Sequence, residues 1–149
     1  GLGVTADGAS TIDFDDLIDL EHSVDPAYRM APSCRFMFND TTLKVLRKLK
    51  DGDSNYIWQP ADARSGAPAT LLNHPYTINQ AMASIGGSTK PVIFGDMQKY
   101  ITRRVKEFTM VRMQERYADY LQVGFLAFNR IDGELADTAA VKHLVMQSG

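Results

Sequence analysis

The sequence predicts an α+β fold, and two observations carry this prediction. Two segments with helical spacing of their apolar residues, residues 12–24 and 41–50, lie in the first third of the chain, whereas short apolar runs typical of strands fill most of the remainder. Helices and strands do not alternate regularly, so a parallel sheet built from βαβ units is not expected. The 149 residues are 44% hydrophobic and 23% charged, which is enough apolar material for one domain with a real core.

Composition also excludes several classes of function. The formal net charge of −2 argues against nucleic-acid binding by the whole chain, although a local basic face is compatible with it. Cys34 is the only cysteine, so no internal disulfide can form. No apolar run reaches the roughly 18 residues of a membrane span, and no secretion signal opens the chain, so neither a membrane protein nor a secreted one is expected.

The first 10 residues are small and polar and are expected to form a flexible lead-in. Because this opening lacks an initiator methionine, we interpret it as a cut point within a longer protein or as an artificial boundary. The helix predicted over residues 12–24 carries Asp13, Asp15 and Asp16 in its first turn. Carboxylates stabilise a helix N-terminus, and residues two apart do not face each other, so a helix start is favoured over a metal site.

A second helix is predicted from Thr41 to Lys50, after a short buried strand at residues 35–38. Asn39 or Asp40 is expected to cap its N-terminus, and Gly52 to end it in the left-handed conformation. The outer face of this helix is basic. A solvated face is favoured over a dedicated contact surface for these residues, which are Lys44, Arg47, Lys48 and Lys50.

The remaining two thirds of the chain read mainly as strands. Residues 59–73 form a long connection with two prolines, and connections of that length inside a domain tend to be functional. The segment 114–122 is compatible with a helix or with an extended crossing. Strands are expected at residues 75–79 and 92–94, in two runs around residues 103–107, along 122–136 with a turn at Asp132-Gly133, and at 139–146.

No catalytic constellation is visible. His22, His74 and His143 are scattered, with none at metal-ligand spacing, and residues 86–90 (GGSTK) place the lysine after the hydroxyl residues, unlike a phosphate loop. We therefore expect no catalytic residue, no cofactor and no metal. A small soluble enzyme or ligand-binding domain, with a pocket assembled only in space, remains the alternative.

Six segments, taken together and in this order, resemble the major capsid proteins of tailed bacteriophages. Each is weak alone, and the ordered set spans roughly residues 11–147. The segments are FMFNDTTLKVLRKLKD (36–51), YIWQP (56–60), LNHPY (72–76), IFGDMQKY (93–100), AFNRIDG (127–133) and AAVKHL (139–144).

The resemblance implies the tailed-phage capsid fold, truncated to an axial domain (residues 11–105), strands of a peripheral domain (106–137) and a closing strand returning to the axial domain (138–149). The family's N-terminal arm, extended loop and spine helix would lie upstream. The implied function is a structural subunit, not an enzyme. It would be made in the bacterial cytoplasm, be located in the virion and self-assemble into pentamers and hexamers around double-stranded DNA. Its partners would be copies of itself and, indirectly, that DNA, with no membrane. A nanocompartment shell of the same fold is an alternative.

Seven charged residues are candidates for subunit contacts under this hypothesis. Three lie on the basic helix, one at the apex of the 59–73 loop and three in the charged segment before residue 108. The loop is either the tip nearest the capsomer axis or a surface loop without a role. Mixed charges of this kind set the register of a contact more than its strength. The candidates are Lys44, Arg47, Lys48, Arg64, Arg103, Arg104 and Glu107.

Overall fold

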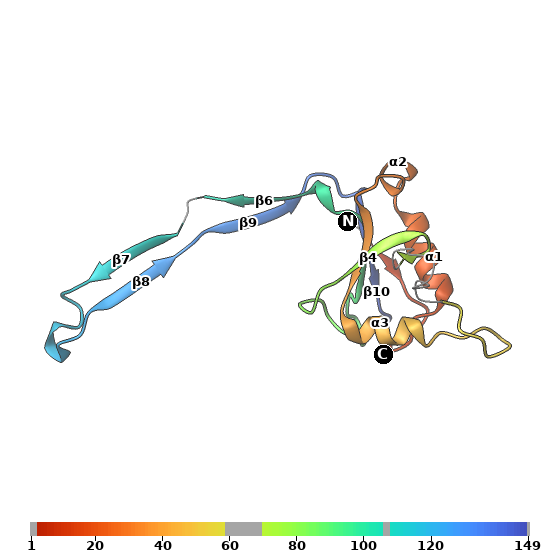
Figure 1. Cartoon of the computed structure of the whole chain (residues 1–149), viewed down its shortest axis with the longest axis horizontal. Helices are drawn as coiled ribbons and strands as arrows, with labels where there is room; N and C mark the ends of the chain where they lie inside the picture. The colour runs from red at the N-terminus through yellow and green to blue at the C-terminus, as the bar shows by residue number, and fades with distance from the viewer. Residues whose placement is uncertain (1–2, 59–69, 106–107, 149) are drawn as a thin grey trace, which may run out of the picture. The chain divides into compact units, whose positions relative to one another are not determined.

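The computed structural model of the chain describes residues 3–58, 70–105 and 108–148 (Figure 1). Two compact units make up the chain. We call the first, Gly1–Lys99 with Asp137–Gly149, the core unit, and the second, Tyr100–Ala136, the arm. In the described residues no helix has the length and apolar character needed to span a membrane.

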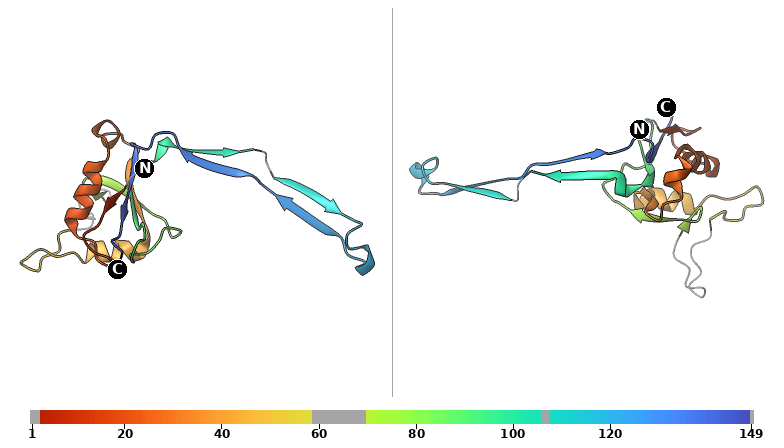
Figure 2. Two further views of the ribbon diagram at one scale, coloured as in Figure 1. Left: turned by 180° about the vertical axis from the view of Figure 1, so that it is seen from behind. Right: turned by 90° about the horizontal axis from the view of Figure 1, so that it is seen from above.

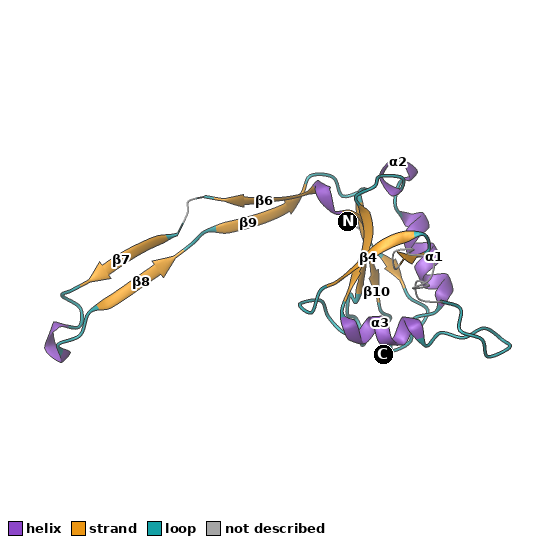
Figure 3. Cartoon of the chain, viewed as in Figure 1, coloured by secondary structure: helices purple, strands orange, loops and turns teal. Residues whose placement is uncertain are grey.

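A six-stranded mixed sheet organises the core unit (Figure 3). The central strand β5 (Val92–Asp96) runs antiparallel to both of its neighbours, β10 (Val141–Val145) and β2 (Cys34–Phe38). At the sides of these, β1 (Val4–Thr5) is parallel to β10 and β4 (His74–Ile78) is parallel to β2. Parallel and antiparallel pairs in one sheet, with helices beside it, confirm the predicted α+β class. The strand order is β1 (Val4–Thr5), β10 (Val141–Val145), β5 (Val92–Asp96), β2 (Cys34–Phe38), β4 (His74–Ile78) and β3 (Thr70–Leu71).

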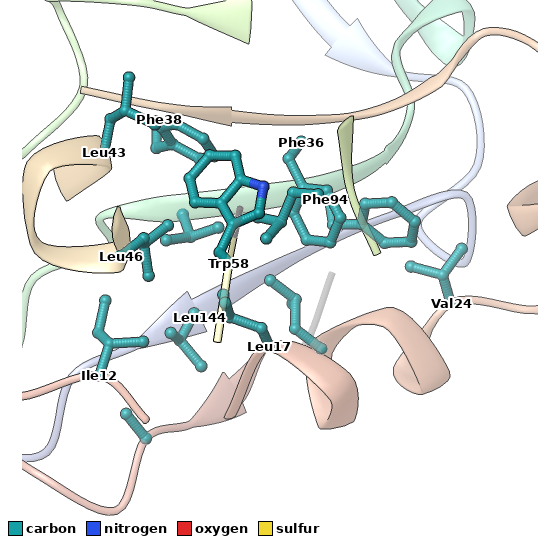
Figure 4. Packing of buried hydrophobic residues seen from close by; sticks show 14 of the residues in the cluster. Ile12, Leu17, Val24, Phe36, Phe38, Leu43, Leu46, Trp58, Phe94 and Leu144 are labelled. Carbon is teal, nitrogen blue, oxygen red and sulfur yellow. The ribbon is translucent and has the colours of Figure 1, made fainter. Parts of the chain in front are cut away.

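One face of this sheet is covered and the other is half open. Along β2 the residues Cys34, Phe36 and Phe38 are buried, while the alternating residues Arg35 and Met37 are only partly buried. The buried face meets α1 (Phe14–Ser23) and α3 (Asp40–Arg47), whose leucines join the strand residues and the indole of Trp58 in a single cluster (Figure 4). A short helix, α2 (Pro26–Arg29), follows α1.

The two predicted helices are confirmed, with their starts set by side-chain acceptors. The Asp16 carboxylate accepts hydrogen bonds from the backbone N–H groups of Asp13 (2.9 Å) and Asp7 (3.2 Å), so the acidic first turn of α1 serves the helix start, as predicted. At α3 the cap is Asn39, whose Oδ1 accepts from the backbone N–H of Thr41 at 3.0 Å.

The predicted role of Gly52 is wrong. Helix α3 ends at Arg47, and Gly52 does not have a positive φ. The following turn is closed by the Asp51 carboxylate, which accepts from the backbone N–H groups of Asp53 (3.0 Å) and Asn55 (2.8 Å), and Ser54 takes the left-handed conformation with φ 67°.

Gly95 is the glycine whose conformation the fold requires. It lies in β5 with φ +146°, and a Cβ atom there would be 2.2 Å from the carbonyl oxygen of Ala140. An L-residue would be strained in this conformation and would also collide with the β10 side of the sheet.

The arm consists of two antiparallel strand pairs in succession. Strand β6 (Tyr100–Arg104) pairs with β9 (Ile131–Leu135), and β7 (Thr109–Met113) pairs with β8 (Gly124–Phe128), as both views of Figure 2 show. A 3₁₀ turn at Ala118–Tyr120 lies between β7 and β8. The two expected strands around residues 103–107 are thus confirmed.

The turn expected at Asp132-Gly133 is wrong. Both residues lie inside β9, opposite Arg103 and Thr102, and the ring of Tyr100 packs over Gly133. The strand therefore continues through this pair. The chain reverses instead between β7 and β8, where Leu121 has φ 55°.

Candidate subunit-contact surfaces

The arm exposes most of the large apolar side chains that lie on the surface. Of the nineteen such side chains that are exposed among the described residues, fourteen belong to the arm, and Leu121 is 98% exposed. No arm residue whose burial is described is buried. An apolar surface this concentrated marks an interaction site in a soluble protein.

The outer half of the arm has one uncharged face. Residues opposite each other in an antiparallel pair share a face, so the pairs Val111–Leu126, Thr109–Phe128 and Met113–Gly124 define it. The other face carries Arg112 opposite Phe125, and Met110 opposite Ala127. The uncharged face can therefore be covered by a partner without burying a charge, whereas the other face cannot.

The inner half of the arm is charged on one face. Arg103 lies opposite Asp132, and Ile101 lies opposite Glu134. These four side chains line a groove of about 310 Å³. Arg104, opposite Ile131, is on the reverse face. The structure thus places the two predicted contact residues Arg103 and Arg104 on opposite faces of one exposed ribbon.

The arm lacks the hydrophobic layer that a two-stranded ribbon needs to be stable in water. A two-stranded ribbon without a hydrophobic layer beside it is marginally stable at best in water. Its six aromatic residues are between 37% and 76% exposed. At roughly 150–250 Å² per ring, and about half exposed, they alone offer on the order of 600 Å² for contact. A standard protein interface takes about 800 Å² from each partner, so the rings of both faces and of the turn together approach the area of one.

A second surface lies on the outside of α3. Lys44, Arg47 and Lys48 are exposed there and, with Asp40 and Leu43, line a groove of about 260 Å³. Among these residues are the three helical candidates from the sequence. The other two candidates, Arg64 and Glu107, lie outside the described residues.

Arg47 is also part of the core unit's internal structure, which the sequence did not predict. Its guanidinium donates to the hydroxyl of Tyr76 at 3.3 Å and lies 5.6 Å from the centre of the Trp58 ring. Lys44 and Lys48 have no such contact among the described residues, so they are the better candidates for an external partner.

Tyr28 anchors the residues at which the chain leaves and re-enters the core unit. Its hydroxyl donates to the Asp137 carboxylate at 2.6 Å, and the ammonium of Lys99 lies 5.7 Å from its ring centre. This hydrogen bond lowers the pKa of Asp137 and raises the pKa of Tyr28. Both ends of the arm are therefore attached to residues that α2 holds in place.

Two side chains that could be reactive, those of Cys34 and His74, pack within the core unit. Burial, followed by the charge of Asp96, raises the pKa of the Cys34 thiol to about 11, so the thiol is a poor nucleophile. His74 lies 3.4 Å from the Glu21 carboxylate and packs edge-on against Phe94 with the ring centres 5.0 Å apart. Within the part of the chain that the structure describes, no three His, Cys, Asp or Glu residues are placed to hold a metal ion.

Comparisons with known proteins bear on the fold and the family of the chain. The model of the phage capsid family matches residues 1–146. The capsid protein of the empty GTA particle, determined with C5 symmetry, is 27% identical with a TM-score of 0.79, and that of the native GTA particle is 27% identical with a TM-score of 0.80. A chain from Gordonia phage Cozz is 12% identical with a TM-score of 0.69, a likeness of fold alone.

Each of these matches covers 99% of this chain but only 50 or 51% of the solved chain, so this chain spans about half the length of the proteins it matches. Among curated proteins no sequence matches it. The capsid fold expected from the sequence is confirmed by the structural matches. The chain belongs to the phage capsid family.

Proposed function

We propose that this chain is a structural subunit of an icosahedral phage or prophage capsid and works by binding copies of itself. The single observation that carries the proposal is the arm, which exposes fourteen large apolar side chains and buries none of its described residues. Membership of the phage capsid family supports the same conclusion, and the enzyme alternative has no comparable support.

The two units can be assigned to two different domains of a capsid subunit. We assign the core unit to the axial domain, near the capsomer centre, and the arm to the peripheral domain. The structural units change over at Tyr100 and Asp137, against the proposed domain limits 11–105, 106–137 and 138–149. Subunits that pack head-to-tail around a five-fold or six-fold axis present two different complementary surfaces, and the arm provides one of them.

The charged candidates set the register of these contacts. Lys44, Arg47 and Lys48 would act at the core unit, and Arg103 and Arg104 at the arm, where exposed charges steer association more than they strengthen it. Arg64 and Glu107 complete the proposed set. In this proposal pentamers and hexamers enclose double-stranded DNA without specific recognition, and the subunit is made in the bacterial cytoplasm, resides in the virion, contacts no membrane and performs no catalysis.

Self-association of the chain tests the proposal. Native mass spectrometry and negative-stain electron microscopy of the wild-type chain should show rings or closed shells. Leu126→Asp, on the uncharged face of the arm, should abolish them, because a carboxylate would be buried without a partner. A matched control is Met30→Asp, a change at an 83% exposed position of the core unit, which should leave association intact.

Two results would contradict the proposal. One is a wild-type chain that stays monomeric at every concentration and ionic strength. The other is a Leu126→Asp variant that assembles as well as the wild type, with circular dichroism confirming that both are folded.

A further inference from the structure

Helix α1 carries an acidic stripe on its outer surface. Asp15 and Asp19 are exposed, and Ile18 between them is half-buried. Residues four apart on a helix lie about 6 Å from each other on one face, so the two carboxylates flank the isoleucine. The inner surface of α1, with Leu17, belongs to the core cluster (Figure 4). The stripe therefore points away from the core unit's interior.

Helix α3 carries the complementary pattern. Lys44 and Lys48 are exposed with the same four-residue spacing, and they line the groove of about 260 Å³ together with the apolar Leu43. Leu46 of α3 points into the same core cluster as Leu17 (Figure 4). Both stripes belong to one compact unit, so each copy of the chain presents an acidic and a basic helix face in a fixed relation.

Neither stripe is neutralised by the described part of its own chain. The one salt bridge among the described residues joins His74 to Glu21, and none of the four stripe charges takes part in it. Other charges lie close by. Asp40 lines the same groove as the two lysines, while His22 at the end of α1 contacts Arg29 at 2.9 Å. Asp40 offsets part of the positive charge of the groove but leaves it cationic, with Arg47 added to the two lysines.

We propose that the α3 groove of one copy receives the α1 stripe of the next copy in a ring, with Asp15 and Asp19 paired to Lys44 and Lys48. Ile18 would then lie over Leu43, covering the apolar floor of the groove. This inference rests on the proposed function, because it names the partner of the basic face. The two surfaces differ, so the contact is heterologous and repeats around an axis, as a ring of identical subunits requires.

Charge reversal and its rescue test the contact. Lys44→Glu/Lys48→Glu and Asp15→Lys/Asp19→Lys should each weaken self-association about tenfold at low ionic strength, since like charges would then face each other. The quadruple variant restores opposite charges at every contact and should associate within about threefold of the wild type. Sedimentation velocity measures all four proteins. The milder pair Asp15→Asn/Asp19→Asn serves if reversal near the helix N-terminus prevents folding.

The outcomes separate this inference from the proposed function. A wild-type chain that never associates contradicts both. If the wild type associates but the quadruple variant is no better than the two reversals, the proposed function stands and the α1–α3 contact is wrong. Association unaffected by the lysine reversal, with a lower nucleic-acid content in the particles, would overturn the contact and assign the basic face to DNA instead. Loss of association in each reversal with recovery in the combination supports it.

Discussion

In the core unit Phe36, Phe38 and Phe94 are fully buried, whereas in the arm Phe125 and Phe128 of β8 are 64% and 50% exposed. The same type of residue thus has two different roles in one chain. The buried rings pack against each other, with the centres of Phe36 and Phe94 4.3 Å apart, and stabilise the monomer. The exposed rings stack on no other ring among the described residues, so they contribute once another molecule covers them.

This difference indicates which interactions stabilise each unit. The core unit completes its sheet and its apolar cluster from its own residues, so it should fold as a monomer. The arm has its backbone hydrogen bonds but no hydrophobic layer, so its order should depend on assembly. Substitutions should therefore separate the units, with monomer stability responding in one and association in the other.

The largest expected effect is on the core unit. Phe36→Ala removes a fully buried ring and should lower the free energy of unfolding by about 3–5 kcal/mol, as measured by urea denaturation. The matched change in the arm, Phe125→Ala at a 64% exposed position, should leave the free energy of monomer unfolding almost unchanged. Equal losses in the two variants would mean that the arm is covered within the monomer, contrary to the comparison.

The rate of thiol alkylation should show the same contrast between the core unit and the arm, with a smaller expected effect. With its pKa raised to about 11, roughly one Cys34 thiol in a thousand is ionised at pH 8, and its side chain is buried. Alkylation should therefore be at least about a hundredfold slower than in the urea-unfolded chain. Val111→Cys in a Cys34→Ala background places a thiol on the exposed arm. That thiol should react rapidly in the dissociated chain and slowly in assemblies, as mass spectrometry of the alkylated protein would measure. Rapid alkylation of Cys34 in the folded chain would show that the core unit opens.

Backbone conformation gives the next test. Gly95→Ala forces an L-residue to φ +146° and places its Cβ against the Ala140 carbonyl, so it should lower the stability of the monomer by about 1–3 kcal/mol from strain, with the clash in addition. Gly52→Ala is the matched control, because nothing lies within 4 Å of a Cβ there and its φ is not positive. Thermal unfolding measured by circular dichroism compares the two. A larger loss for Gly52→Ala would contradict the assignment of strain to β5.

The sequence predicts the elements of the core unit well, because local periodicity determines them. Leucines on successive turns indicate α3, and the alternating burial of residues 34–38 matches a strand with one covered face. It does not predict how the strands pair. Strand β6 meets β9 across some thirty residues, and alternating apolar residues read the same whether a neighbour in the fold covers them or not.

For the contact surfaces, too, local patterns in the sequence predict some features, whereas contacts between distant residues are not predicted. Charge and helical spacing identify Lys44 and Lys48 from the sequence, but nothing local shows that Arg47 is held by Tyr76 and Trp58, which lie 29 and 11 positions further along the chain. The pair Asp132-Gly133 predicts a turn because it favours reversals, whereas in the fold both residues lie in an extended strand and the ring of Tyr100 packs over Gly133.

The smallest expected effect is a pH dependence confined to the core unit. Burial lowers the pKa of His143 below its usual 6.5, and the nearby charges of Lys90 and Lys142 lower it further. The unfolded chain therefore binds this proton more readily than the folded chain does. The contribution of His143 to stability is complete above pH 6.5 and declines as the pH falls from 6.5 through the lower pKa of the folded state. Urea denaturation across this range should show a shallower decline in His143→Gln than in the wild type.

The arm contains no histidine, so contacts that the arm makes with another arm should not change between pH 7.5 and 6. An identical decline in the variant would contradict the assignment of this titration to His143, whereas a decline lost in the variant would assign it to that residue of the core unit.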